Sequence, residues 1–319
     1  MKYSIGIDLG GTNIAAGVVD ENNVIVGRAN VKTALPRPAE SIADSIKEVA
    51  LMALVDASVL MSDVTSVGIG TPGAVNSDGV VEFSSNLGFN DTPLRDMVAE
   101  RIDKPVFLEN DANCAALGEQ TAGCGNGVKN FIAVTLGTGV GGGIILDGRL
   151  LTGVNGAAGE IGHMAIHFDG LACQCGRTGC FEQYASATAL VRQTKDALLM
   201  DREKESIMWE MIDGDMSKVE GLTTFNAAHE GDRIANEVID QFVEHLSCGV
   251  TNLINIFQPE MVCIGGGISK QGDFIIKPLI EKVERKRYTK HAKVQTEICA
   301  ATLGNDAGII GAALLERQH

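Results

Sequence analysis

The chain has 319 residues, of which 45% are hydrophobic and 21% charged, a composition typical of a globular protein rather than a disordered or membrane-embedded one. Its formal net charge is −15, from 26 Lys and Arg against 41 Asp and Glu, so nucleic acid and anionic membrane surfaces are poor partners. There is no signal peptide and no apolar run of the roughly 18 residues that a membrane span needs, and we expect a cytoplasmic protein of about two domains.

The first third of the chain predicts a strand hairpin followed by alternating helices and strands. Apolar, β-prone residues predict strands over 3–8 and 14–20, joined by the tight glycine turn Asp8-Leu-Gly-Gly-Thr-Asn13. Two strands joined by so short a loop are antiparallel neighbours. This order differs from the strand–turn–helix order of a Rossmann fingerprint or a Walker loop. Further along, the spacing predicts strands over 24–32, 65–70 and 105–109 and helices over 39–55, 92–102 and 111–122.

The pattern begins again near residue 130. Strands are predicted over 130–136 and 140–146, with the turn Gly137-Thr-Gly139 between them. An offset of 127 residues aligns this stretch with the first hairpin and matches Gly10 to Gly137. The repeat indicates two similar halves, although two unrelated glycine-rich hairpins would also give it.

The rest of the chain is predicted to be largely helical up to residue 257. A helical pattern runs over 183–245 with polar breaks near Gly214 and Gly231, and a long helical stretch covers 233–257. After it we expect a strand over 260–264 that ends in three glycines, a helix over 273–287, a strand over 293–299 and a terminal helix over 306–317. Because strands alternate with helices, the predicted class is α/β, with two halves packed around a cleft.

Three glycine-rich turns indicate a nucleotide site. In the first, backbone N–H groups and the side chains of Thr12 and Asn13 offer donors to an anion, and Asp8 at its entrance implies Mg²⁺ between the carboxylate and a phosphate. The second, Gly137-Thr-Gly139, offers similar donors, and Gly265-Gly-Gly267 follows a strand. One glycine turn is usually only a turn, whereas two of phosphate type half a chain apart favour a nucleotide.

Three cysteines and a histidine indicate a zinc site. Cys173-Gln-Cys175-Gly-Arg-Thr-Gly-Cys180 places three thiols within eight residues, in a predicted surface loop, and His163 lies ten residues earlier. Three thiolates and one imidazole complete a tetrahedral Zn²⁺ site, and free thiols are the alternative. The other five cysteines lie in apolar segments and are expected to be small core residues: Cys114, Cys124, Cys248, Cys263 and Cys299.

Two further stretches carry carboxylates beside predicted secondary structure. In Glu109-Asn-Asp111, between a strand and a helix, Asn110 or Asp111 suits a helix N-cap, and a carboxylate there suits a general base at the mouth of a cleft. The residues alone leave both interpretations open. In Glu160-Ile-Gly-His163, the glycine permits a sharp turn, so that the two flanking side chains can face one ligand.

Together these stretches resemble the ROK family of sugar kinases and repressors, and among its members the bacterial glucokinases most. The most specific signal is Glu160-x-Gly-His163 followed by Cys173-x-Cys175-Gly-x-x-Gly-Cys180-x-Glu182. The resemblance covers nearly the whole chain and implies a duplicated actin-like, hexokinase-like (ribonuclease H-like) α/β fold with an interdomain cleft. We expect a small domain formed by 1–115 and the helix at about 304–319, and a large domain, 116–303, that carries the zinc loop.

The resemblance also implies a function: phosphorylation by Mg-ATP of the 6-hydroxyl of a hexose, glucose first. Asp111 would be the general base, and His163 would ligate a structural zinc through one ring nitrogen and hydrogen-bond the sugar through the other. The implied sugar contacts are Gly73, Asn86, Asn110, Asp111, Glu160, His163 and Glu182. The implied Mg-ATP contacts are Asp8, Gly10, Gly11, Thr12, Asn13, Gly137, Thr138, Gly139, Gly265, Gly266 and Gly267. The implied zinc ligands are His163, Cys173, Cys175 and Cys180. Phe89 stands where many relatives have Trp, which changes the shape of the sugar pocket.

Several alternatives remain at this stage. The hexose could be fructose, allose, N-acetylmannosamine or N-acetylglucosamine. A sugar-responsive repressor of the same family needs a DNA-binding domain ahead of the first phosphate turn, whereas seven residues precede Asp8. A filament-forming or chaperone-like ATPase of the same superfold would have no use for the sugar residues or the zinc cluster. By analogy with relatives we expect a homodimer or homotetramer.

Overall fold

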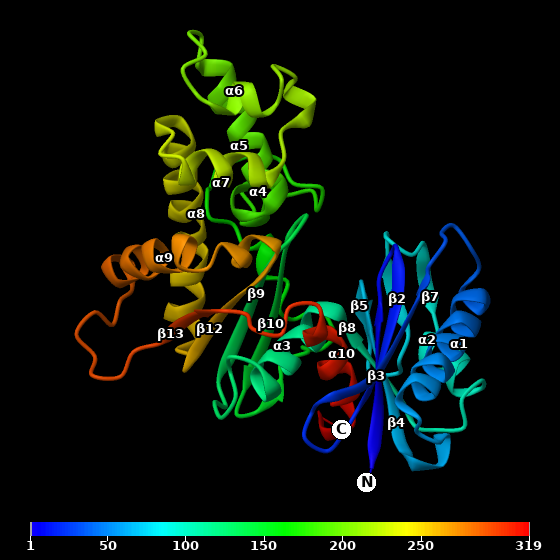
Figure 1. Ribbon diagram of the computed structural model, residues 1–319. Helices are drawn as coiled ribbons and strands as arrows, with labels where there is room; N and C mark the ends of the chain where they lie inside the picture. The colour runs from blue at the N-terminus through cyan, green and yellow to red at the C-terminus, as the bar shows by residue number, and fades with distance from the viewer. Residues whose placement is uncertain (1, 319) are drawn as a thin grey trace. The chain divides into compact units, whose positions relative to one another are not determined.

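The computed structural model describes residues 2–318. They fold into two compact units (Figure 1). Unit 1 comprises residues 1–133, 142–159 and 301–319, and unit 2 comprises residues 134–141 and 160–300. The chain therefore passes between the units four times.

A five-stranded mixed sheet forms the core of unit 1. Its strand order is β3-β2-β1-β4-β8. The predicted antiparallel hairpin is confirmed, because β1 pairs with β2 in register from Ser4↔Val19 to Leu9↔Ile14. β4 is parallel to both β1 and β8. The strands are β1 (Tyr3–Leu9), β2 (Asn13–Val19), β3 (Ile25–Lys32), β4 (Val64–Thr71) and β8 (Val106–Asn110).

Helices cover both faces of this sheet. α1 (Ala39–Ala57) buries an apolar stripe against one face, and a Cβ on Gly27 of β3 would lie 2.5 Å from the Ala57 side chain. α10 (Asp306–Ala313) lies on the other face, where a Cβ on Gly6 or Gly68 would lie 1.8 Å from a carbonyl oxygen of α10. Such contact requires glycine in the strands, and it fixes α10 directly on β1 and β4. α3 (Asp111–Ala122) packs beside α10.

A second, three-stranded sheet in unit 1 has no counterpart in the sequence analysis. Its order is β5-β6-β7, with the strands β5 (Ala74–Val75), β6 (Val81–Ser84) and β7 (Phe89–Thr92). The helix predicted over 92–102 is shorter, and α2 covers Leu94–Ala99 because Pro93 precedes it and the chain turns after Glu100.

The predicted repeat of the strand hairpin is confirmed. β2 spans residues 13–19 and β10 spans residues 140–146, which is an offset of 127. The sheet that contains β10 has the order β11-β10-β9-β12-β13, and β12 is parallel to β13. Its strands are β9 (Phe131–Leu136), β10 (Val140–Leu146), β11 (Arg149–Leu150), β12 (Met261–Gly266) and β13 (Glu297–Ala300).

The helices of unit 2 follow the predicted pattern. α8 (Arg233–Phe257) is the longest, and buries a stripe that includes Phe242, Leu246, Val250 and Leu253. Gln258, in the left-handed conformation, ends it ahead of Pro259. The other helices are α4 (Glu182–Ala185), α5 (Ala187–Met200), α6 (Met208–Met211), α7 (Gly221–His229) and α9 (Asp273–Lys286). Short 3₁₀ turns span Met61–Asp63, Ile161–His163, Met216–Lys218, Gly267–Gln271 and Leu315–Gln318.

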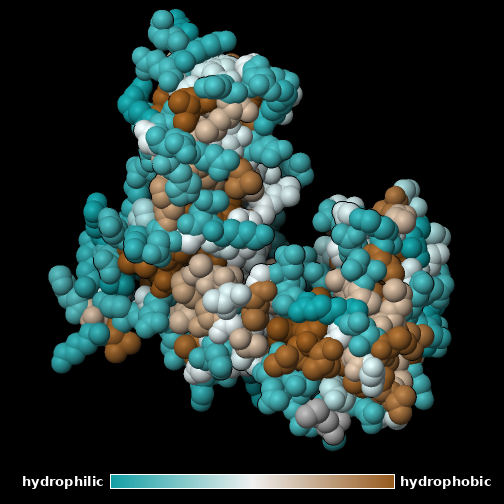
Figure 2. Space-filling view, in the orientation of Figure 1, coloured by the Kyte–Doolittle hydropathy of each residue, from teal (hydrophilic) through white to brown (hydrophobic). Residues whose placement is uncertain are grey.

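Hydrophilic side chains cover much of the visible surface (Figure 2). A few large apolar side chains remain exposed, such as those of Val55 and Phe168. Within residues 2–318, no helix is both long enough and apolar enough to cross a membrane.

Candidate active site

The first phosphate turn is a tight loop at the end of β1. The Gly10 N–H donates to the Asn13 carbonyl at 2.9 Å, which closes the turn. The fully buried Thr33 stabilises the turn through two hydrogen bonds. The Thr33 hydroxyl donates to the Gly10 carbonyl at 2.6 Å, and the Thr33 N–H donates to the Thr12 carbonyl at 2.9 Å. Gly11, Thr12 and Asn13 are exposed. The donors of this turn are therefore held in place and open to a ligand.

Asp8 lies at the entrance of that turn, between its partners Ala15 on β2 and Gly70 on β4. The first turn of α10 covers it, since a Cβ on Gly308 would lie 3.6 Å from the Asp8 carboxyl group. Burial, and next the negative charge of Asp111, raise the pKa of Asp8 from 3.8 to about 6. A carboxylate whose ionisation is disfavoured by a neighbouring carboxylate suits a divalent cation placed beside it.

Asn110 and Asp111 lie at the junction of β8 and α3. Asn110 is the N-cap of α3, because its side-chain oxygen accepts the N–H groups of Ala112 and Asn113 at 2.9 and 3.3 Å. Asp111 is the first helical residue, and burial raises its pKa although hydrogen bonds from Ala112 N–H, its own N–H and the Asn110 side chain oppose the shift. Asn110 therefore caps the helix, and the Asp111 carboxylate stays the predicted base.

Glu109 and Asn113 stabilise the junction of β8 and α3, and the sequence pattern predicted no role for either residue. The Glu109 carboxylate accepts the Asn110 N–H at 2.7 Å and the Asn113 side-chain amide at 3.0 Å. Asn113 is 1% exposed. A Glu ahead of an N-cap and an Asn one turn into the helix are common surface residues, so only the fold shows that they fix the Asp111 backbone.

The other predicted sugar residues of unit 1 lie beside these groups. The Gly73 carbonyl accepts the Asn110 side-chain amide at 3.1 Å, and its φ of 110° together with the Phe83 carbonyl leaves no room for a Cβ. Asn86 lies against the phosphate turn, because a Cβ on Gly11 would be 3.9 Å from the Asn86 Cβ. Phe89 is buried at the start of β7.

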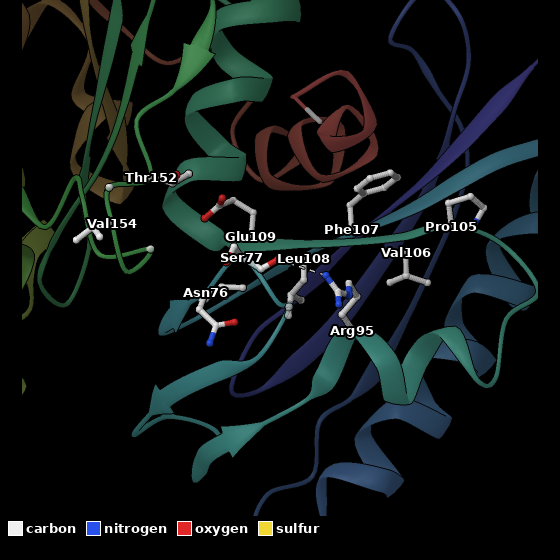
Figure 3. A pocket seen from close by; sticks show the side chains of 14 residues that line it. Asn76, Ser77, Arg95, Pro105, Val106, Phe107, Leu108, Glu109, Thr152 and Val154 are labelled. Carbon is white, nitrogen blue, oxygen red and sulfur yellow. Dashed lines mark hydrogen bonds between the residues drawn. The ribbon is translucent and has the colours of Figure 1, made fainter.

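Two cavities of about 460 Å³ each lie within unit 1. One adjoins the phosphate turn and Asp8, and Arg28 and Asp306, which form an ion pair with N–O distances of 2.5 and 2.7 Å, also line it. The other follows β8 (Figure 3), where Phe107 and Glu109 point toward α3 and α10 while Val106 and Leu108 point to the opposite side. Within the described part of the chain, no predicted site residue lines this second cavity.

The second glycine turn, in unit 2, contacts several predicted residues. The Gly137 N–H donates to the Gly139 carbonyl at 3.0 Å. A Cβ on Gly139 would lie 2.6 Å from a Glu182 carboxylate oxygen, and a Cβ on Gly266 would lie 2.3 Å from the Leu136 carbonyl oxygen. Unit 2 thus brings its predicted phosphate turn, the predicted adenosine glycines and Glu182 together. Gly265 ends β12 with Gly266, and Gly267 begins the following 3₁₀ turn.

The four predicted zinc ligands form one cluster. The ligand atoms of His163, Cys173, Cys175 and Cys180 all lie within 4.8 Å of one another. Two ligands of one tetrahedral zinc at about 2.3 Å lie about 3.8 Å apart. The Cys175 and Cys180 sulfurs are 3.6 Å apart, and Cys173 Sγ is 3.7 Å from His163 Nδ1, so the cluster fits the ion.

The predicted surface loop is largely exposed, but two of its three cysteines are buried. Cys180 is fully buried and Cys173 is 8% exposed, while Cys175 is exposed. The loop folds back on itself, with isolated β-bridges between Ala165 and Cys180 and between Ala172 and Thr178, which the sequence pattern does not show. Of the remaining cysteines, Cys114 and Cys263 are core residues as predicted, whereas Cys124, Cys248 and Cys299 are partly exposed.

The two ring nitrogens of His163 lie close to different residues. Nδ1 faces Cys173 and also lies 3.7 Å from Glu182 Oε1, while Nε2 lies 3.9 Å from Glu160 Oε2. The Glu182 carboxylate also accepts the Cys173 thiol at 3.1 Å. A ligand that reached Glu160 would therefore meet the Nε2 side of a histidine whose Nδ1 side faces the thiols.

Comparisons with known proteins place the chain in a family. The model of the ROK family matches residues 4–319. The chain belongs to the ROK family. It is 38% identical over 319 residues to a glucokinase of Streptomyces coelicolor, covering all of this chain and 98% of that protein. It is 39% identical to a glucokinase of Thermotoga maritima, covering 99% and 97%.

The solved structure of a ROK glucokinase from Streptomyces griseus, in complex with glucose and AMPPNP, has 39% sequence identity to this chain. It covers 99% of this chain and 100% of its own, with a TM-score of 0.83. The fold class predicted for the present chain is confirmed: it has the α/β, actin-like and hexokinase-like duplicated fold.

Proposed function

We propose that this protein is an ATP-dependent hexose kinase that transfers the γ-phosphoryl group of ATP to the 6-hydroxyl of glucose. The observation that carries the proposal is the position of Asp111. It is a half-buried carboxylate on the first turn of α3, close enough to Asp8 for its charge to raise the pKa of Asp8. The similarity to glucokinases over the full length favours glucose as the hexose.

Phosphoryl transfer requires alignment and charge neutralisation more than covalent chemistry from the protein. The sugar oxygen attacks the γ-phosphorus, the bond from phosphorus to the bridging oxygen of ADP breaks, and Asp111 accepts the hydroxyl proton. Asp8 would hold Mg²⁺, which neutralises charge on the transferred phosphoryl group. The N–H donors of the turns at Gly10–Asn13 and Gly137–Gly139 would hold the phosphates, and Gly265, Gly266 and Gly267 would border the adenosine.

Paired hydrogen bonds would hold the sugar. Asn86, Asn110 and the backbone at Gly73 would contact hydroxyls. Glu160, His163 and Glu182 would bind the anomeric end. A site built to hydrogen-bond hydroxyls can reject an analogue that lacks one by about 10⁴.

A structural zinc held by His163, Cys173, Cys175 and Cys180 completes the proposal. The ligand distances and the burial of two of the thiols support it. The four protein ligands fill a tetrahedron, so the ion has no open position for Lewis-acid chemistry. It would instead fix the loop that presents His163 beside Glu160 and Glu182. We also expect a homodimer or homotetramer, which sedimentation of the purified protein tests.

A sugar panel with a coupled assay of ADP release tests the function. We expect kcat/KM to be highest for glucose, ahead of fructose, allose, N-acetylmannosamine and N-acetylglucosamine. A different winner among these sugars would change the substrate and keep the reaction. ADP release that no sugar increases, without any phosphosugar product, would refute the proposal.

A further inference from the structure

Glu119 is a buried carboxylate that the proposed reaction does not use. It lies on α3 eight residues after Asp111 and is 3% exposed. Acidic side chains are almost never buried to this extent unless they are paired. The hydrogen-bond partners of Glu119 therefore indicate its role.

Neutral N–H and O–H groups surround the Glu119 carboxylate. Oε1 accepts the N–H groups of Thr302 and Leu303 at 3.0 and 2.7 Å. Oε2 accepts the Thr302 hydroxyl and the Cys124 N–H, each at 3.2 Å, and shares the Thr302 N–H at 3.1 Å. An ionised carboxylate is purely an acceptor, so it satisfies every one of these donors, whereas an amide would set N–H against N–H on one side.

These hydrogen bonds join the second half of α3 to the start of α10. Thr302 and Leu303 directly follow the point, after Ala300, at which the chain returns to unit 1. The Leu303 carbonyl in turn accepts the Asp306 N–H at 3.1 Å, at the first residue of α10. The carboxylate therefore holds the bend that leads into α10.

The packing of α3 against α10 is unusually close. A Cβ on Gly118 would lie 2.1 Å from the Ala307 carbonyl oxygen, and a Cβ on Gly311 would lie 1.7 Å from the Cys114 carbonyl oxygen. The first turn of α10, at the Glu119 end of this contact, covers Asp8, and α3 begins with Asp111. How α10 covers Asp8 therefore depends on how α10 is held against α3.

We infer that Glu119 is a positioning residue for phosphoryl transfer, which fixes the segment ahead of α10 against α3 and so sets the position of the α10 turn that covers Asp8. It touches neither substrate nor the reacting atoms. The inference rests on the proposed function. A misplacement of about 1 Å in a reacting group can cost on the order of 10² in rate, so the loss of this clamp is expected in kcat.

The test is Glu119→Gln, which keeps the size of the side chain and removes its acceptor capacity on one side. We expect kcat to fall about 10- to 100-fold while KM for glucose changes less than about threefold, because the sugar contacts remain. The matched control is Thr224→Val, which breaks a buried hydroxyl pair with Thr194 at 2.6 Å in unit 2. The control is expected to lower Tm and leave kcat unchanged.

Hydrogen exchange gives a readout that does not depend on activity. Glu119→Gln is expected to speed exchange of the amides of Thr302, Leu303 and Asp306 at least about tenfold, with β12 unchanged. Thr302→Val, which removes one donor alone, is expected to lower kcat less and in the same direction, and it stands in if Glu119→Gln does not fold.

Three results would overturn the inference. The first is a folded variant with kcat within about twofold of wild type. The second is unchanged exchange at Thr302 and Leu303. The third is a loss of kcat that merely matches the loss of folded protein, as a purely structural role requires. If wild type phosphorylates no hexose, the proposed function fails, and the exchange measurement still decides whether Glu119 holds α10.

Discussion

At the scale of the residue, Asp111 carries the chemistry, and its replacement separates binding from reaction. Asp111→Asn keeps the shape of the side chain and an acceptor for the Ala112 N–H. We expect kcat to fall by about 10² to 10⁴, with KM for glucose and Tm close to wild type, because only the proton acceptor is lost. Steady-state kinetics and a thermal melt measure this. A variant with near-full activity would remove Asp111 from the mechanism.

Asp8 gives a second prediction, in which stability and activity change in opposite directions. Its pKa is about 6 in the folded protein and 3.8 ordinarily, so between these values the folded state binds the extra proton. The contribution of Asp8 to the free energy of unfolding is therefore greatest below pH 3.8, and it is lost as the pH rises to about 6. At pH 7 without divalent cations, Asp8→Asn is expected to stabilise the fold by on the order of 1–3 kcal/mol and to lower activity.

Denaturant unfolding of wild type and Asp8→Asn from pH 4 to pH 7 measures that difference. The gain should shrink as pH falls toward 4, because the folded state then has Asp8 protonated and no longer carries the unfavourable buried charge. An equal gain at every pH would show that the Asp8 carboxylate is not the cause. Wild-type kcat/KM is expected to fall below about pH 6, as the cation site loses its charge.

The roles of single residues could be predicted only where their chemistry is local. Asp8 and the glycines of its turn could be identified, because a tight turn needs those residue types within a few positions. Thr33 and Arg28 could not, since their partners lie 23 and 278 residues away in the sequence. The same applies to Glu119, since two of its partners, Thr302 and Leu303, are more than 180 residues away.

At the scale of the element, the zinc loop gives a separate prediction. We expect about one zinc per chain by elemental analysis, and chelation should lower Tm and activity together, because the ion holds the loop that carries His163. Cys180→Ser should lose the zinc, since Cys180 is fully buried in the cluster. Cys248→Ser, a partly exposed thiol on α8, is the control and should keep it. A fully active sample without zinc would end this proposal.

Long or repeated elements could be predicted from the pattern of residues, and short ones could not. α8 has 25 residues with a continuous apolar stripe, and the two glycine hairpins have the same spacing, so each gives a strong periodic signal. The strands β5, β6 and β7 have two to four residues each. Alternation over so few positions cannot be distinguished from a loop, and tertiary packing decides their structure.

At the scale of the whole molecule, the charge of −15 bears on the repressor alternative. DNA binding depends on the counterions that are released when a protein neutralises phosphates. A protein with a large negative net charge is repelled by those phosphates instead. We expect no binding of duplex DNA at about 0.1 M salt, measured by fluorescence anisotropy with and without glucose. Tight, salt-sensitive binding would favour a regulatory role for this member of the family.

Sugar binding should also be visible in the stability of the whole chain. A ligand that binds only the folded state adds about 2.7 kcal/mol at a concentration of one hundred times Kd, so saturating glucose should raise Tm by a few degrees. Asp111→Asn should keep that shift while losing phosphorylation, because its sugar contacts persist. Xylose has the ring hydroxyls of glucose but no 6-hydroxymethyl group, so it should shift Tm less and yield no phosphosugar. Equal shifts and equal ADP release with both sugars would show that the site does not recognise the 6-hydroxyl, and the reaction assigned to Asp111 would then need another acceptor.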